Sequence, residues 1–198
     1  YQYFGLARFA FANGHPYWGY RFLGWGMHYL QDLTQPYHAT TLPGDDLTSM
    51  LLMEGKALAG YDNDKRAAIE RVATRHNEVE RYQFAWLRHL LLTGADNPML
   101  TAYADATQDA DYPAYSTDYL RQVVSAQADA QAVAFDEAIG QWLTTPGATQ
   151  SFSAGNQLPA ERYDHTRLNE QLVQLLRHKR KNRRNYDSAG LDRPPPAQ

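Results

Sequence analysis

Apolar residues recur along most of the chain at the spacing of one face of an α-helix. No run of alternating apolar and polar residues is long enough to indicate a strand. The pattern therefore predicts an all-α fold, formed by a single mostly helical domain. Turn-forming sequences around Gly14, Gly44 and Gly147 separate the helices. The expected helices cover residues 2–12, 17–34, 46–59, 63–93, 116–143 and 160–180.

Capping residues give the long helix at 63–93 well-defined ends. Asp62 and the polar residues after it suit its N-terminus, and Gly94 followed by Pro98 suits its C-terminus. The segment after Gly94, rich in Ala, Asp and Tyr, is expected to be irregular over residues 95–115. Residues 1–180 are thus predicted to form the helical domain, and residues 181–198 a basic, then proline-rich tail.

Composition narrows the chemistry that the chain can carry. The chain has 198 residues, 43% of them hydrophobic and 21% charged, as in an ordinary globular protein. It contains no cysteine, so any metal must be held by nitrogen and oxygen ligands. Residues 177–184 hold six of the 19 basic residues, although the net charge is -3. An acidic body with a basic tail argues against a reader of duplex DNA, because such a protein carries its basic face on the fold itself.

Aromatic residues are concentrated at the start of the chain. Residues 1–30 contain 11 of the 25 aromatic residues and no Asp or Glu. The segment has the pattern of neither a signal peptide nor a membrane span, and we expect native sequence to precede Tyr1. The aromatic stripe is interpreted as core packing. Its members are Tyr3, Phe4, Phe9, Phe11, Tyr17, Trp18, Phe22 and Trp25.

Three potential metal ligands lie close together in the second predicted helix and just after it. His28 and Asp32 are four residues apart, so they share one helix face with Cβ atoms roughly 5–6 Å apart. His38 follows after Pro36, which can start a new turn and redirect the chain. The bend would aim the His38 imidazole into the same cavity that His28 and Asp32 face.

The long helix repeats this spacing with His76 and Glu80. A single pair of this kind is more often a hydrogen-bonded or surface pair than a metal site, but two pairs together with His38 favour a metal. Imidazole and carboxylate ligands without thiolates favour zinc over magnesium or calcium, with manganese and iron left open. His89 lies about 220° round the helix from His76, so we expect it to face elsewhere.

The run G-W-G-M-H-Y-L-Q-D-L-T-Q-P-Y-H-A, residues 24–39, resembles the signature of the zinc-dependent phospholipase C and single-strand nuclease superfamily. In that signature, His-x-x-x-Asp and a further His are followed later by His-x-x-x-Glu or His-x-x-x-Asp. The resemblance implies a mostly helical domain of the phospholipase C type. It also implies a cluster of three zinc ions that hydrolyses phosphodiesters, by in-line attack of a metal-bound hydroxide on phosphorus.

The same resemblance assigns roles to the residues that match. His38, His76 and Glu80 would hold one zinc ion. His28 and Asp32 would supply half of a second site, and Asp32 would also touch the third ion, which makes it the expected catalytic residue.

The chain departs from the family pattern upstream of His28. The family takes further ligands from a free N-terminal residue, an early His, and an upstream Asp and His. Here the residues before His28 include one His and no Asp. We therefore expect that the N-terminal portion of the domain is missing and lies on another segment or chain. One zinc site would be complete and a second partly built, with up to three zinc ions once upstream sequence is present. This chain alone would then be a poor catalyst.

The signature resembles lipid-cleaving members more than the nuclease branch, so a phospholipid is the favoured substrate and contact with a membrane surface is expected. The Leu- and Met-rich segment 47–58 could dip into lipid, although an ordinary buried helix is the commoner explanation. A single-strand nuclease or nucleotidase of the same fold stays open as an alternative, with nucleic acid the less favoured partner. A non-catalytic helical binding or assembly module with a structural zinc is the other alternative. The family suggests a secreted or periplasmic location.

Overall fold

The structure is a computed structural model that describes residues 2–105, 107, 116, 118–148 and 163–188, with the backbone alone over 181–188. Helices make up the regular structure of these ranges, and no strand occurs within them, which confirms the all-α prediction. In chain order they are α1 (Gln2–Ala12), α2 (Pro16–Asp32), α3 (Pro36–Ala39), α4 (Leu47–Leu58), α5 (Asn63–Thr93), α6 (Pro98–Ala104), the π-helix η2 (Leu120–Ser125), α7 (Ala126–Leu143) and α8 (Thr166–Ser188).

Sequence patterns located the first helices well. Helices α1 and α5 have the predicted bounds, and α2 and α4 differ from prediction by at most two residues at either end. Gly94 ends α5 in the left-handed conformation, with φ 65°, as its position predicted. Asp62 occupies the N-cap position of α5, but its carboxylate accepts a hydrogen bond from Arg66 at 2.7 Å instead of capping the backbone.

Two later predictions need correction. The segment expected to be irregular contains α6, because the Asn97 side chain accepts a hydrogen bond from the Met99 N–H at 2.9 Å and Pro98 fits the first helical turn. Pro98 therefore follows the end of α5, as predicted, and is also the first residue of α6. Helix α8 continues to Ser188, past the predicted helix end at 180. Residues 189–198 of the predicted tail lie outside the described ranges.

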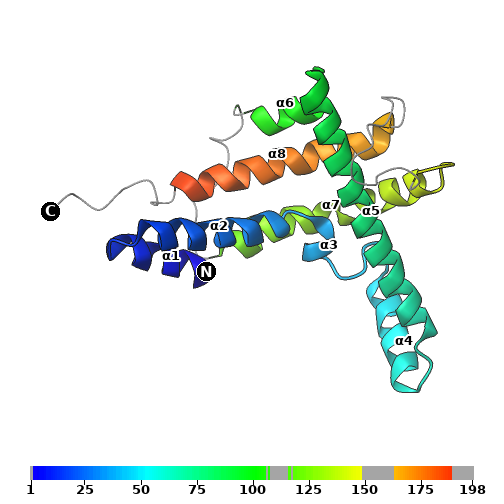
Figure 1. Cartoon of the computed structure of the whole chain (residues 1–198). Helices are drawn as coiled ribbons and strands as arrows, with labels where there is room; N and C mark the ends of the chain where they lie inside the picture. Colours follow the sequence, from blue (N-terminus) through cyan, green and yellow to red (C-terminus); the bar gives the residue numbers. More distant parts are fainter. Residues whose placement is uncertain (1, 106, 108–115, 117, 149–162, 189–198) are drawn as a thin grey trace.

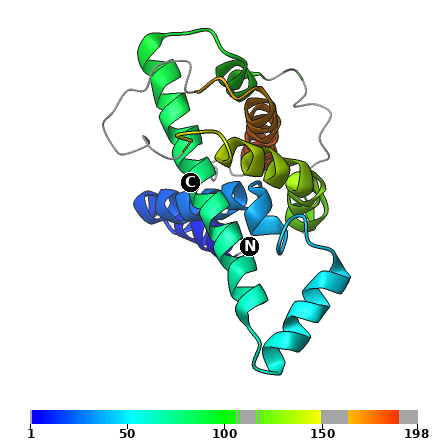
Figure 2. The same cartoon turned by 90° about the vertical axis from the view of Figure 1, so that its right-hand side faces the viewer.

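Helices α1 and α2 form one antiparallel pair, helices α7 and α8 form another, and the long helix α5 crosses beside them (Figure 1). Helices α1 and α2 form a hairpin beside α8, and Figure 2 shows α4 and the first half of α5 as an arm that leaves the body. The main core lies between α5, α6, α7 and α8. Its large members are Val79, Tyr82, Trp86, Leu90, Met99, Phe135, Ile139, Trp142, Tyr163, Leu168, Leu172, Leu175 and Leu176.

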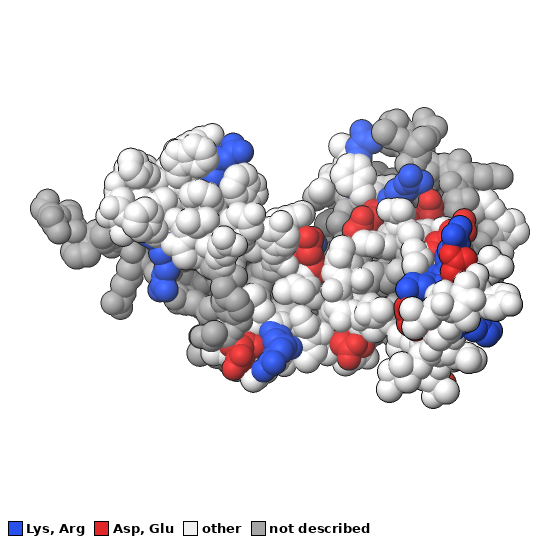
Figure 3. All heavy atoms as spheres, turned by 90° about the horizontal axis from the view of Figure 1, so that it is seen from below, with Lys and Arg blue, Asp and Glu red and all other residues white. Residues whose placement is uncertain are grey.

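The aromatic stripe of α1 and α2 does not form the core that its composition predicted. Phe4 is buried, but Phe9 is 68% exposed and Tyr17 is 63% exposed. The two helices meet where rings of α1 lie on glycines of α2, because a Cβ at Gly26 would lie 2.3 Å from the Phe4 ring and one at Gly19 would lie 2.6 Å from the Phe11 ring. Other rings of the stripe stack on one another, as Trp18 does on Phe22 at 5.9 Å between centroids. In Figure 3 this left-hand end of the surface is mostly white with a few blue groups.

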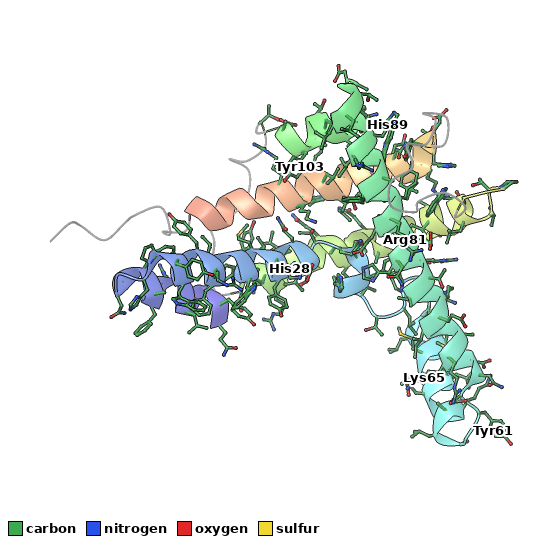
Figure 4. The ribbon with its side chains drawn as sticks, viewed as in Figure 1. His28, Tyr61, Lys65, Arg81, His89 and Tyr103 are labelled. Atoms are coloured by element: carbon green, nitrogen blue, oxygen red, sulfur yellow. The ribbon has the colours of Figure 1, made fainter. Side chains whose placement is uncertain are left out.

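Helix α4 is exposed. The expectation that the Leu- and Met-rich segment 47–58 forms an ordinary buried helix is therefore wrong. None of its side chains is buried, and Leu58 is 90% exposed. Ion pairs hold α4 to α5, from Lys56 to Asp64 at 2.7 Å and from Lys65 to Glu54 at 2.8 Å. Figure 4 shows Lys65 near the lower end of this arm. Within the described ranges, none of the helices combines the length and apolar character needed to span a bilayer.

Candidate metal centre

His38, His76 and Glu80 lie together where α3 meets α5. Each offers a ligand atom, and these three atoms all lie within 4.8 Å of one another. His76 Nε2 is 3.0 Å from Glu80 Oε1. The His38 and His76 rings are nearly perpendicular, at 84°, with centroids 4.7 Å apart. Among the described residues, no other group of three or more His, Asp or Glu side chains is close enough together to hold a metal ion.

The donor set of this cluster suits zinc. Two imidazoles and one carboxylate with an open fourth position form a donor set known from catalytic zinc sites. Zinc bonds of about 2.0–2.2 Å in a tetrahedron place ligand atoms roughly 3.4 Å apart. His76 and Glu80 are already near that spacing, at 3.0 Å, and no two of the three ligand atoms are more than 4.8 Å apart, so small movements would bring them onto one ion. Zinc would be held by His38, His76 and Glu80.

A buried carboxylate on α7 supports both histidines. Asp136 forms an ion pair with Arg75, the residue before His76. It also accepts a hydrogen bond of 2.6 Å from the Tyr37 hydroxyl, one residue before His38. Asp136 thus ties the backbone on either side of the cluster to the same point of α7. Such outer contacts fix the orientation of metal ligands.

The partners of the Asp136 carboxylate are tightly packed against α7. A Cβ at Gly140, one turn along α7, would lie 2.8 Å from the Arg75 guanidinium, so the glycine makes room for that side chain. Burial raises the pKa of the Tyr37 phenol well above its usual range, and the hydrogen bond to Asp136 acts in the same direction. Tyr37 therefore stays a neutral donor to Asp136. Its ring packs against the His76 ring, with centroids 5.6 Å apart.

Helix α3 holds His38 through a second contact to α7. The Thr40 hydroxyl donates to Asp129 Oδ1 at 2.6 Å, two residues after the ligand. Pro36 occupies the first turn of α3 and is buried, and the residue before it has extended backbone with ψ 122°. The chain bends at Pro36 as the sequence predicted, but the bend brings His38 to His76 and Glu80 on α5, and among the described residues His38 does not form a ligand group with His28 and Asp32.

His28 and Asp32 form a pair of their own on α2. His28 Nε2 lies 3.2 Å from Asp32 Oδ2, and the His28 side chain is 67% exposed. The pair does not join the three-residue cluster among the described residues. Figure 4 shows His28 on α2. A metal role for His28 and Asp32, and the catalytic role of Asp32, stay predictions.

His89 faces away from the cluster, as its helical phase predicted. It lies on the upper part of α5 in Figure 4 and stacks on Trp86, with ring centroids 5.4 Å apart. Its other neighbour is the Tyr163 ring at 5.3 Å. His89 therefore packs against aromatic residues of the main core.

Sequence reasoning missed the supporting residues Asp136, Arg75 and Tyr37. Arg75 and Tyr37 are next to the ligands in the chain, but 61 and 99 positions separate them from Asp136. Neither spacing follows from helix periodicity. A signal exists after the fact, because Asp136 is a charged residue at an inward position of α7, between Phe135 and Ile139.

Comparisons with models of protein families, with curated proteins and with solved structures found no match to this chain.

Proposed function

We propose that the chain belongs to a zinc-dependent phosphodiester hydrolase of the phospholipase C type. The observation that carries the proposal is the cluster of His38, His76 and Glu80, which brings together from two helices the residues that the resemblance assigns to one zinc ion. Three protein ligands leave the fourth position of a tetrahedral zinc ion for water or substrate, as a catalytic site requires.

The residues of the cluster have defined tasks in this proposal. A zinc ion, when bound, would supply Lewis acidity and an activated water for attack on phosphorus. His38 and His76 would bind it as neutral imidazoles, and Glu80 would contribute one negative charge. Asp136 would hold the two histidines in place through Tyr37 and Arg75.

The exposed leucines of α4 favour a lipid substrate. Leu47, Leu51 and Leu58 follow a spacing that places them on one side of the helix, and all three are exposed. Met50, Met53 and Ala57 lie on a different side of the helix and are partly buried, and α4 is in contact with α5. An apolar stripe on an arm beside the metal cluster suits contact with the acyl region of a lipid surface.

Single-stranded nucleic acid is the second candidate substrate, because of the aromatic face of α1 and α2. Trp18, Trp25 and Tyr17 are exposed there, and the Arg21 guanidinium lies 5.3 Å from the Trp25 ring centre. Aromatic rings with arginine form the stacking surface that binds unpaired bases. A helical binding module with a structural zinc, the third possibility, would bind the metal without hydrolysing either substrate.

The test compares diacylphosphatidylcholine vesicles with single-stranded DNA as substrates of the zinc-loaded protein. It uses the natural polypeptide with any upstream sequence, and His76→Ala as the inactive control. Hydrolysis of the lipid, lost in the control and weakened by Leu58→Asp, is the expected result. Cleavage of DNA alone would select the second candidate. Stoichiometric zinc without hydrolysis of either substrate would contradict the hydrolase.

A further inference from the structure

A pocket with a volume of about 260 Å³ lies between the hairpin of α1 and α2 and the π-helix η2. The two helices supply most of the lining of this hairpin pocket, and Leu120 of η2 completes it. Among the described residues that line it, none is charged, and none belongs to the cluster of His38, His76 and Glu80. The hairpin pocket is therefore a separate place at which a ligand can bind.

The inner part of the hairpin pocket is apolar. Leu30 is 1% exposed and Phe4 is 8% exposed. Gly26 is also buried and adds no side chain to the wall, and its backbone belongs to the middle of α2. A buried water molecule needs several polar partners, and these side chains offer none. An apolar group is therefore favoured over water or an ion at this depth.

The exposed residues of the lining are polar. Gln2 is exposed, and Tyr29 is 53% exposed. The Tyr29 ring stacks on the Tyr3 ring, with centroids 5.5 Å apart and planes 9° apart. An amide and a phenol can form hydrogen bonds with a polar group of a ligand, and neither adds a charge. The entrance thus suits an uncharged polar group.

The third side of the hairpin pocket has an uncommon backbone. Helix η2 is a π-helix that continues directly into α7. Turns of π-helix are rare, and they occur frequently at functional sites. Leu120, the first residue of η2, packs with Phe4 and Leu30 in a second, smaller hydrophobic cluster. The backbone and the cavity thus mark the same place independently.

The volume of the hairpin pocket limits the size of the ligand. An apolar cavity of about 150 Å³ holds benzene, so this pocket can hold a larger body. At roughly 30 Å³ for each water-sized group, the volume corresponds to about nine such groups. Pockets for drug-sized ligands begin at about 300 Å³. One alkyl chain of about nine carbon atoms fits this space, whereas two chains side by side do not.

We propose that the hairpin pocket binds one alkyl chain of an amphiphilic molecule, with the polar end of that molecule at Gln2 and Tyr29. The chain lies against Phe4, Leu30 and Leu120, where each methylene group leaves water for apolar surroundings. A lining without charge selects the chain and not an ionic head group. This inference goes beyond the proposed function, because it requires neither zinc nor hydrolysis.

Calorimetric titration of n-alkanols from hexanol to dodecanol into the natural polypeptide tests this site. One alkanol is expected to bind per chain. The affinity should rise about fourfold with each methylene group. The rise should stop at about nine carbon atoms, because further methylene groups stay in water. Removal of zinc should not change the affinity.

Leu120→Trp fills part of the hairpin pocket with a larger side chain. It is expected to weaken decanol binding at least about 10-fold and to end the rise at a shorter chain, because fewer methylene groups are then buried. Leu91→Trp on α5 is the matched control, because Leu91 is 71% exposed and does not line the pocket. It should leave decanol binding unchanged. If Leu120→Trp does not fold, as judged by circular dichroism, Leu33→Phe takes its place.

Three results would overturn the alkyl site. They are an affinity that keeps rising up to dodecanol, equal decanol affinity in Leu120→Trp and wild type, and tighter binding of phenol than of hexanol. The first two would indicate adsorption elsewhere on the surface, and the third would indicate an aromatic ligand.

The two proposals fail in different ways. Binding of one alkanol with a limiting chain length, without hydrolysis of lipid or DNA, would support the alkyl site and contradict the hydrolase. Zinc-dependent hydrolysis by a protein that binds no alkanol would support the hydrolase and contradict the alkyl site.

Discussion

Two histidine–carboxylate pairs with the same sequence spacing lie on different helices of this molecule. His28 and Asp32 on α2 and His76 and Glu80 on α5 have nitrogen–oxygen distances of 3.2 and 3.0 Å. The His28 side chain is 67% exposed, whereas that of His76 is 22% exposed. The second pair also has His38 beside it, which brings a third ligand from another helix.

The difference shows what the i, i+4 spacing leaves undetermined. Helix geometry brings the two members of each pair together on either helix. A metal site needs a third group at the same point, and it needs the ligands to be held there. On α5 both needs are met by α3 and by Asp136, which anchors the residues before His38 and His76.

Removing one histidine from each pair should give the largest difference between the two helices. His76→Ala is expected to lower zinc affinity by more than about 100-fold, because the loss of a ligand exceeds the 10- to 100-fold effect of an outer contact. His28→Ala should leave the affinity of the cluster unchanged. Competition with a chromophoric chelator measures both. Equal losses in the two variants would show that the pairs work as one site.

Removing the charge of Asp136 tests the support of the cluster. Asp136→Asn should lower zinc affinity about 10- to 100-fold. It should also lower the free energy of unfolding by about 3 kcal/mol, because Arg75 keeps a partly buried charge without its partner. Chelator competition and urea denaturation give the two values.

The neighbouring residue on α7 offers the control for that variant. Glu137 pairs with Arg167 at 2.7 Å, but both side chains are exposed. Glu137→Gln should therefore cost less than about 1 kcal/mol and leave zinc binding alone. If Glu137→Gln weakened zinc binding as much as Asp136→Asn, the support assigned to Asp136 would be wrong.

Adding a methyl group beside Arg75 should have a smaller effect on the cluster. Gly140→Ala should stabilise α7 by about 0.5–1 kcal/mol through helix propensity, yet its new Cβ displaces the Arg75 guanidinium. Zinc affinity should fall by a few-fold, and thermal stability should fall less than in Asp136→Asn, because both partners of the ion pair keep their charges. Gly24→Ala on α2 meets nothing within 4 Å, so it should stabilise without changing zinc affinity. Equal zinc affinity in both variants would show that Arg75 does not help to position the metal ligands.

Local patterns predicted the local features of the fold. Helix ends at Gly94 and the turn at Pro36 follow from the conformational preferences of single residues, and the pairing of His76 with Glu80 follows from helix pitch. The meeting of His38 with His76 followed from the family resemblance, because periodicity alone does not bring α3 to α5.

Features that depend on distant packing could not be predicted in this way. Asp136 meets Tyr37 across 99 positions. The aromatic stripe of α1 and α2 has the composition of a core, but whether Phe9 or Tyr17 is covered depends on which helices pack over them. The hairpin pocket likewise joins Phe4 to Leu120, so the pattern of neither segment predicts it alone.

Anomalous diffraction at the zinc absorption edge, from crystals of the zinc-loaded protein, shows directly whether His38, His76 and Glu80 hold a metal. We expect a zinc peak within bonding distance of these three residues in the wild type, and its disappearance in His76→Ala. A peak bound by His28 and Asp32 alone, or no peak at the three-residue cluster, would rule out this metal site.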